Sequence, residues 1–153
     1  MRATIDRRHV LFALAGGFVA AATPFVFAGT ALPAVVAYRN PGCGCCENWA
    51  KLMKKAGFNI TMLDDPDLQA RRTALGVPPS LAGCHLTQMD SYVIEGHVPV
   101  DDILKLLSER PAARGLAVPG MPSGSPGMEG GEAEKYDVLI FSADGSSKIY
   151  SSH

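Results

Sequence analysis

The stretch Asn40-Pro41-Gly42-Cys43-Gly44-Cys45-Cys46-Glu47, or NPGCGCCE, holds three of the chain's four cysteines and stands where the apolar pattern changes. Before it, residues 34–38 form a short apolar run rich in β-branched side chains, which predicts a buried strand. After it, apolar side chains recur at the i, i+3, i+4, i+7 spacing of a helix, at Trp49, Leu52, Met53 and Ala56. We therefore expect the cysteines at a helix N-terminus that directly follows a strand.

The region after this helix repeats the order of strand and helix. Residues 58–63 predict a second strand, and Asp65-Pro66 is expected to cap and begin a second helix that ends near Gly76. The prolines of Val77-Pro78-Pro79 then break the chain, where thioredoxin-like folds carry a proline turn opposite their cysteine pair. We expect a cis peptide bond at Pro78 or Pro79.

The C-terminal half predicts further strands, one helix and a long loop. Residues 115–131 are rich in glycine and proline, so they are expected to form a loop without regular structure. The other expected elements are strands at 85–89 and 92–94, a helix between Pro99 and Pro111, and a hairpin of strands at 136–141 and 148–150. The predicted fold class is α/β and thioredoxin-like, a central mixed sheet with flanking helices and a C-terminal β-hairpin.

The N-terminal residues have the pattern of an export signal. A basic start is followed by an apolar run at residues 10–22, and small side chains favour cleavage before Gly29. We therefore expect a signal peptide at residues 1–28, a single thioredoxin-like domain at 29–153, and a periplasmic location. The pair Arg7-Arg8 also resembles a twin-arginine signal, so that route and the general secretory route both stay open. An uncleaved membrane anchor is the alternative interpretation.

The charge of the expected mature domain argues against two classes of partner. Removing the three arginines and one aspartate of residues 1–28 from the chain's 14 basic and 15 acidic residues leaves 11 and 14, a formal net charge of −3. No basic stripe is present for nucleic acid or anionic lipid, so we expect no nucleic-acid partner and no stable membrane insertion after cleavage. The pairs Lys54-Lys55 and Arg71-Arg72 are interpreted as solvated helix surface.

The cysteine spacing indicates one site rather than scattered thiols. Cys43 and Cys46 form a C-x-x-C pair between a strand and a helix, which is typical of a thioredoxin-like redox or metal motif. Helix N-termini stabilise thiolates, which favours both nucleophilic attack and metal binding. Cys84 follows the proline turn by a few residues, so the fold is expected to carry it back to the others. The candidate metal ligands are Cys43, Cys45, Cys46 and Cys84.

Three interpretations of this four-cysteine site stay open. Two structural disulfides suit an oxidising compartment. A zinc or iron–sulfur site is a second interpretation, although the adjacent Cys45 and Cys46 fit one tetrahedral ion poorly. Soft thiolates select Cu(I), whose low coordination number and tolerance of bridging sulfur suit a crowded C-x-C-C array. The third interpretation is therefore a cluster of several Cu(I) ions bridged by thiolates.

Histidines and methionines near the cysteines are further candidates. His85 is expected to point away from its neighbour Cys84 by the alternation of a strand. For His97, an exposed turn residue and a group near the cysteines are both open interpretations. Met121 and Met128 offer thioethers in the glycine-rich segment, which suggests a lid or entry path for Cu(I), whereas Met53 is expected in the core.

Four stretches together resemble the periplasmic copper-resistance CopG family: YRNPGCGCCENWA, LGVPPSLAGCHL, SYVIEGHVP and GLAVPGMPSGSPGME. The resemblance covers the chain from about Ala34 to Tyr150. It implies a thioredoxin-like fold, export to the periplasm, and a thiolate-bridged cluster of several copper ions on Cys43, Cys45, Cys46 and Cys84. It also implies a part in copper resistance through redox handling of copper.

Two classes of function use the same residues. A binding protein would store Cu(I) or pass it to a copper-handling partner in the periplasm, whereas an oxidoreductase would couple thiol chemistry to a change in copper oxidation state with a redox partner. A third function, as a thioredoxin-like thiol-disulfide oxidoreductase, would use Cys43 and Cys46 alone. In that function Cys45 and Cys84 would have no role.

Overall fold

A seven-stranded mixed sheet runs through residues 32–153, the part of the chain that the computed structural model describes. The export signal predicted at residues 1–28 lies outside the described residues. Across the sheet the strand order is β2-β1-β3-β4-β5-β6-β7. The strands are β1 Ala34–Arg39, β2 Asn59–Asp64, β3 His85–Met89, β4 Tyr92–Glu95, β5 Gly115–Ala117, β6 Asp137–Phe141 and β7 Ser147–Ser152.

Two of the six strand pairs in the described part of the chain are parallel, and a helix connects the two strands of each parallel pair. β1 is parallel to β2, to which α1 connects it, and β4 is parallel to β5, to which α3 connects it. β3 pairs antiparallel with β1 on one side and with β4 on the other. The prediction of a thioredoxin-like α/β fold with a central mixed sheet and a C-terminal hairpin of β6 and β7 is confirmed.

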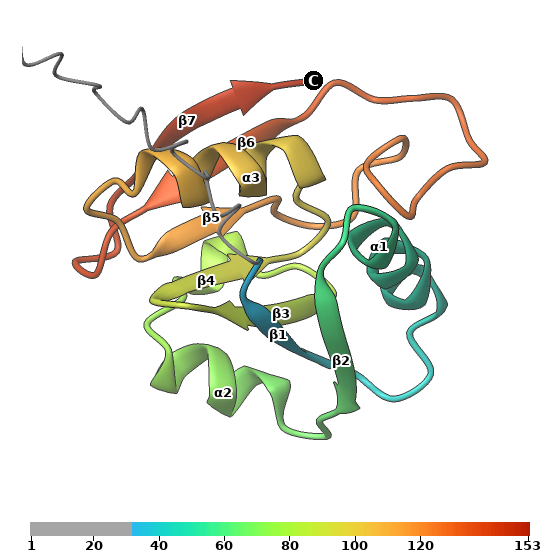
Figure 1. Cartoon of the computed structure of the whole chain (residues 1–153), viewed down its shortest axis with the longest axis horizontal. Helices are drawn as coiled ribbons and strands as arrows, with labels where there is room; N and C mark the ends of the chain where they lie inside the picture. Colours follow the sequence, from blue (N-terminus) through green and yellow to red (C-terminus); the bar gives the residue numbers. More distant parts are fainter. Residues whose placement is uncertain (1–31) are drawn as a thin grey trace, which may run out of the picture. The chain divides into compact units, whose positions relative to one another are not determined.

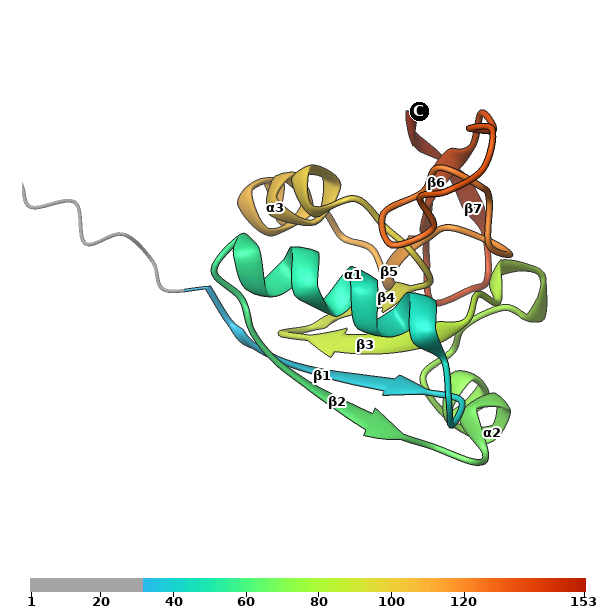
Figure 2. The same ribbon diagram turned by 90° about the vertical axis from the view of Figure 1, so that its right-hand side faces the viewer.

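Three α-helices cover the two faces of the sheet (Figure 1). α1 (Gly44–Lys55) and α3 (Val100–Glu109) lie on one face, and α2 (Leu68–Ala74) lies on the other, as the rotated view makes clear (Figure 2). A short 3-10 helix, η1 (Pro79–Leu81), follows α2. None of the described helices is both long and apolar enough to cross a bilayer.

The core is divided by the sheet into two apolar layers. On the α1 and α3 face, Trp49 and Met53 pack against the sheet, so the prediction that Met53 belongs to the core is confirmed. On the α2 face, Leu68 packs with strand residues that include Leu86 and Val93. Because neighbouring strand residues point to opposite faces, the alternation in β3 and β4 assigns each side chain to one layer.

The boundaries of α1 agree with the sequence pattern, but α2 begins later than expected. Gly57 follows α1 with a φ of +96°, a left-handed conformation that glycine adopts without strain. Asp67, not Asp65, caps α2, because its carboxylate accepts the Ala70 N–H at 3.1 Å. Asp65 instead accepts the Asp67 N–H and pairs with Arg71.

Two expectations about the irregular segments are wrong. No peptide bond in residues 32–153 is cis, so Pro78 and Pro79 are both trans. The segment 115–131 is also not entirely irregular, because its first three residues form β5. Three residues are too few to show the alternation that predicts a strand. Gly115 is required there, since a Cβ at this position would collide with the Val93 carbonyl oxygen of the neighbouring strand.

Candidate metal centre

Three of the four cysteines stand at the start of α1. Cys43 is the N-cap residue, and Cys45 and Cys46 lie in the first turn. Cys46 is fully buried, whereas Cys43 and Cys45 are half-buried. Arg39 fixes this turn to the end of β1, since its guanidinium donates to the Cys43 carbonyl oxygen at 3.2 Å and pairs with Glu47.

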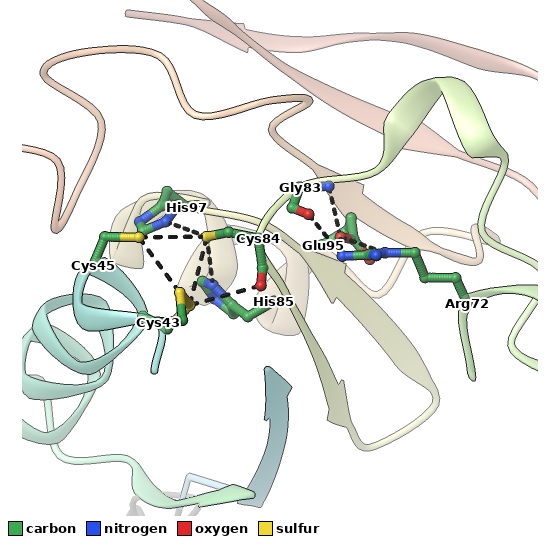
Figure 3. Close-up of polar contacts among 9 residues, drawn as sticks. Cys43, Cys45, Arg72, Gly83, Cys84, His85, Glu95 and His97 are labelled. Carbon is green, nitrogen blue, oxygen red and sulfur yellow. Dashed lines mark hydrogen bonds and ion pairs between the residues drawn. A yellow bond between two sulfur atoms is a disulfide. The ribbon is translucent and has the colours of Figure 1, made fainter. Parts of the chain in front are cut away.

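Cys84 completes the cluster from a different part of the fold. It lies in a bend directly before β3, and its Sγ atom is 3.8 Å from that of Cys45 and 3.6 Å from that of Cys46. The Sγ atoms of Cys43 and Cys45 are 3.5 Å apart, and all four sulfur atoms lie within 4.8 Å of one another. Figure 3 shows this convergence. The structure thus brings the four predicted residues together, and their role as metal ligands stays a prediction.

A disulfide joins Cys43 to Cys46, while Cys45 and Cys84 are free. The structure therefore holds the C-x-x-C pair in its oxidised form. Two further thiols stand beside the bond. Only after reduction of this disulfide by two electrons could all four sulfur atoms act as thiolate ligands.

His97 faces Cys84 directly, so its interpretation as an exposed turn residue is wrong. The side chain is fully buried, and its Nε2 atom lies 2.6 Å from Cys84 Sγ. On the other side of the ring, Nδ1 lies 2.7 Å from the Pro126 carbonyl oxygen. Because a carbonyl oxygen only accepts, Nδ1 carries a proton and the neutral ring turns its Nε2 lone pair toward the thiol. Burial lowers the pKa of His97.

His85 also lies beside the cluster, although the sequence predicted that it points away. Its Nδ1 atom is 3.5 Å from Cys84 Sγ. The alternation rule fails here because Cys84 stands in the bend before β3 rather than in the strand. The buried ring packs on Trp49 with centroids 4.4 Å apart, and its Nε2 has no hydrogen-bond partner. Burial, with the nearby His97 second, holds the pKa of His85 well below its usual value.

The thiol of Cys84 sits in surroundings that disfavour its ionised form. Burial is the largest cause, and the neighbouring Cys45 adds to it, raising the pKa of Cys84 to about 12. The thiol is therefore protonated at neutral pH as long as no cation is close by. A metal ion would reverse this balance, because a coordinated thiol is deprotonated.

The segment between β5 and β6, the 118–136 loop, packs against the cluster. Gly127 approaches α1 so closely that a Cβ would lie 2.7 Å from the Trp49 nitrogen and 2.9 Å from the Cys45 carbonyl oxygen. Met121 is 55% exposed and lines a surface pocket of about 340 Å³ together with Cys43 and Cys84. Two of the four cysteines thus line a cavity that opens to the surface. Met128 is half-buried elsewhere in the loop.

The sequence interpretation missed a buried ion pair beside the bend that carries Cys84. Arg72, expected on a solvated helix surface, is 6% exposed and pairs with the fully buried Glu95 at 2.8 Å. A signal for this burial existed, because Arg72 lies one helical turn after Leu68, on the apolar side of α2. Glu95 likewise shares its strand face with Val93.

Comparison with known proteins gives two findings. A family model described as "Protein of unknown function, DUF411" matches residues 81–128, which include Cys84 and most of the 118–136 loop. Two solved structures, named copper resistance protein CopG Form 1 and Form 2, are each 41% identical to this chain. Each match covers 80% of this chain and 98% of the other, with a TM-score of 0.75. No curated protein sequence matches.

Proposed function

The chain belongs to the family of the copper resistance protein CopG, and on that premise we propose that it binds copper and acts in copper resistance. More specifically, we propose that Cys43, Cys45, Cys46 and Cys84 hold several Cu(I) ions through bridging thiolates. The protein would act in the periplasm after removal of residues 1–28. A copper-handling or redox protein of that compartment would be its partner.

The observation that carries this proposal is the convergence of four sulfur atoms within 4.8 Å. Sulfur ligands suit Cu(I), and a thiolate can join two cuprous ions, so a crowded set of four thiolates fits several ions. Cys45 and Cys46 are adjacent in sequence, yet both approach Cys84. The donor set therefore fits the chemistry of copper in its reduced state.

His97 is placed to take part in metal loading. Cys84 must lose its proton to become a ligand, and burial raises the pKa of this thiol. The Nε2 atom of His97 lies 2.6 Å from the sulfur with its lone pair directed at it, so it is placed to accept that proton. Loading also needs a two-electron reductant of the thiol class, because Cys43 and Cys46 are joined in the oxidised chain.

The test is a metal count on protein reduced and loaded with Cu(I) under anaerobic conditions. Elemental mass spectrometry should find more than one copper per chain in the natural protein and fewer in Cys84→Ser. Met53→Leu, which changes a buried sulfur on the same helix outside the cluster, is the control and should bind as much copper as the natural protein. One zinc per chain, or an unchanged count in Cys84→Ser, would contradict the proposal.

A second candidate function is thiol–disulfide exchange, and the Cys43–Cys46 disulfide favours it. Cys43 is half-buried and lines the surface pocket, so a partner thiol could reach its sulfur atom. The metal-free reduced protein should reduce the disulfides of insulin if this is its function. If instead a small amount of protein oxidises copper over many turnovers, the function is redox interconversion of copper.

A further inference from the structure

The buried ion pair of Arg72 and Glu95 lies on the α2 face of the sheet, beside the bend that carries Cys84 (Figure 3). The Nε and Nη2 atoms of Arg72 donate to the Oε1 atom of Glu95 at 3.0 and 2.8 Å. Neither side chain is hydrogen-bonded to a cysteine. Through space, the Glu95 carboxylate is only the smallest of the causes that raise the pKa of Cys84. The hydrogen-bonded connection between the pair and the site runs through the backbone.

That connection is Gly83, the residue directly before Cys84. The Gly83 N–H donates to Glu95 Oε1 at 2.7 Å, and the Gly83 carbonyl oxygen accepts from Arg72 Nη2 at 2.7 Å. The ion pair thus binds both polar groups of the Gly83 backbone. One carboxylate oxygen accepts three hydrogen bonds, which fixes the position of the peptide relative to α2 and β4.

The other backbone hydrogen bonds of the bend at residues 82–84 are made by Ala82, whose N–H donates to the Pro79 carbonyl oxygen and whose carbonyl oxygen accepts from Gly120. The bend precedes β3, so the hydrogen bonds of the sheet do not include Gly83 or Cys84. Gly83 packs bare backbone against Gly96, where a Cβ would lie 2.7 Å from the Gly96 Cα. The polar restraint on Gly83 is the ion pair, and Gly83 is bonded directly to the Cys84 backbone.

Stability alone does not explain this ion pair. Burying two charges costs free energy that their attraction repays only with excellent geometry, and apolar replacements are often neutral or stabilising. Here the cost is higher still, because Glu95 Oε2 is buried without a hydrogen-bond partner. What the pair provides, and apolar side chains could not, is a pair of hydrogen bonds to the N–H and the carbonyl oxygen of one residue.

We propose that Arg72 and Glu95 are positioning residues that hold Cys84 in the sulfur cluster by binding the Gly83 peptide from the opposite face of the sheet. The expected effect on metal binding rests on the proposed copper site. The structural part of the proposal, the hold on Gly83, stands without any metal. The two parts can therefore be tested separately.

The first test is made on the metal-free protein. In Arg72→Met combined with Glu95→Leu, amide hydrogen exchange at Gly83, followed by NMR, should speed up by about tenfold or more, since the carboxylate that accepts this N–H is gone. Glu95→Gln keeps an oxygen acceptor and should retain the protection. Arg71→Met, which breaks a different ion pair on the same helix, is the matched control and should also retain it.

The second test measures Cu(I) affinity by competition with a chromophoric cuprous chelator. Loss of a partner that orients a ligand typically weakens metal binding about 10–100-fold, and we expect this for the double variant but not for Glu95→Gln or Arg71→Met. Urea unfolding should show the double variant folded. If it does not fold, Arg72→Lys is measured instead and should weaken binding in the same direction, because lysine cannot place two donors as the guanidinium does.

The outcomes separate the two proposals. If the natural protein binds no Cu(I), the proposed function fails. The amide exchange rate of Gly83 still shows whether the ion pair holds the Gly83 backbone. The positioning role is overturned if the double variant has the same Gly83 exchange rate and the same copper affinity as the natural protein. The same holds for Arg72→Lys if that variant is used. Faster exchange with unchanged affinity also overturns it, because Cys84 would then not depend on the hold.

Discussion

The first turn of α1 and the bend at Cys84 deliver sulfur to the same place, but different interactions hold them there. Cys45 and Cys46 are part of a helix, so its backbone hydrogen bonds fix their spacing. Cys84 stands outside regular structure, and its sulfur atom lies against His97. The residue before it, Gly83, contacts Gly96, Arg72 and Glu95. The comparison teaches that similar substitutions in the two regions should have unequal effects, because local contacts hold one region and long-range contacts hold the other.

The largest expected effect on copper binding comes from oxidising the cysteine pair at the start of α1. With the Cys43–Cys46 disulfide formed, Cys45 and Cys84 are the two remaining thiols, so we expect no more than one Cu(I) per chain instead of several. Copper retained after desalting, measured with and without prior reduction, checks this. A reduced and reoxidised sample is the control. Equal copper in both forms would show that the C-x-x-C pair contributes no ligand.

A matched pair of glycine substitutions compares the two regions directly. Gly44→Ala adds a Cβ that meets nothing within 4 Å, whereas the Cβ of Gly83→Ala would lie 2.7 Å from the Gly96 Cα. We expect Gly44→Ala to be neutral or stabilising by about 0.5 kcal/mol, and Gly83→Ala to lower the free energy of unfolding by about 1–3 kcal/mol. Urea unfolding measures both. Equal stability would refute the difference in packing.

The pH dependence of Cys84 alkylation measures how closed the bend is. Because burial raises the pKa of this thiol to about 12 in the metal-free protein, its reaction with iodoacetamide should rise about tenfold per pH unit from pH 7 to 10. The stability from burying the neutral thiol is present below the unfolded pKa of about 8.5 and is lost as pH rises toward 12. A plateau near pH 9, seen by peptide mass spectrometry, contradicts this.

The smallest expected effect concerns the 118–136 loop. If Met121 and Met128 form a lid or entry path, Met121→Leu combined with Met128→Leu should slow Cu(I) uptake several-fold without changing the number of ions bound. Met121 lines the pocket beside Cys43 and Cys84, which motivates the expectation. Met89→Leu, a change in the core, serves as the control in stopped-flow absorbance. Equal uptake rates would remove this role.

The sequence predicts what is local in this molecule. The strand before the cysteines, the helix after them and the terminal hairpin all follow from spacing and turn residues. The return of Cys84 also follows, because the order of elements in a thioredoxin-like fold carries the segment after the proline turn back to the helix start. The family resemblance agrees with the solved CopG structures.

The sequence does not predict the contacts that hold Cys84. The strand pattern directs His85 away from Cys84, because it cannot show that Cys84 stands in a bend. The position of His97 depends on Pro126, 29 residues away, which the local sequence does not reveal. The local pattern likewise places Arg72 on the surface, because its burial depends on Glu95, 23 residues away. β5 is too short to show a pattern of its own and is defined by its partners.

The packing of His85 on Trp49 gives the molecule a built-in optical signal. The chain has one tryptophan, and its buried indole contacts an imidazole whose other side reaches Cys84. Emission from Trp49 therefore originates beside the thiols and nowhere else. Quenching or a spectral shift on loading with copper would report occupancy of the centre in real time, without any added label.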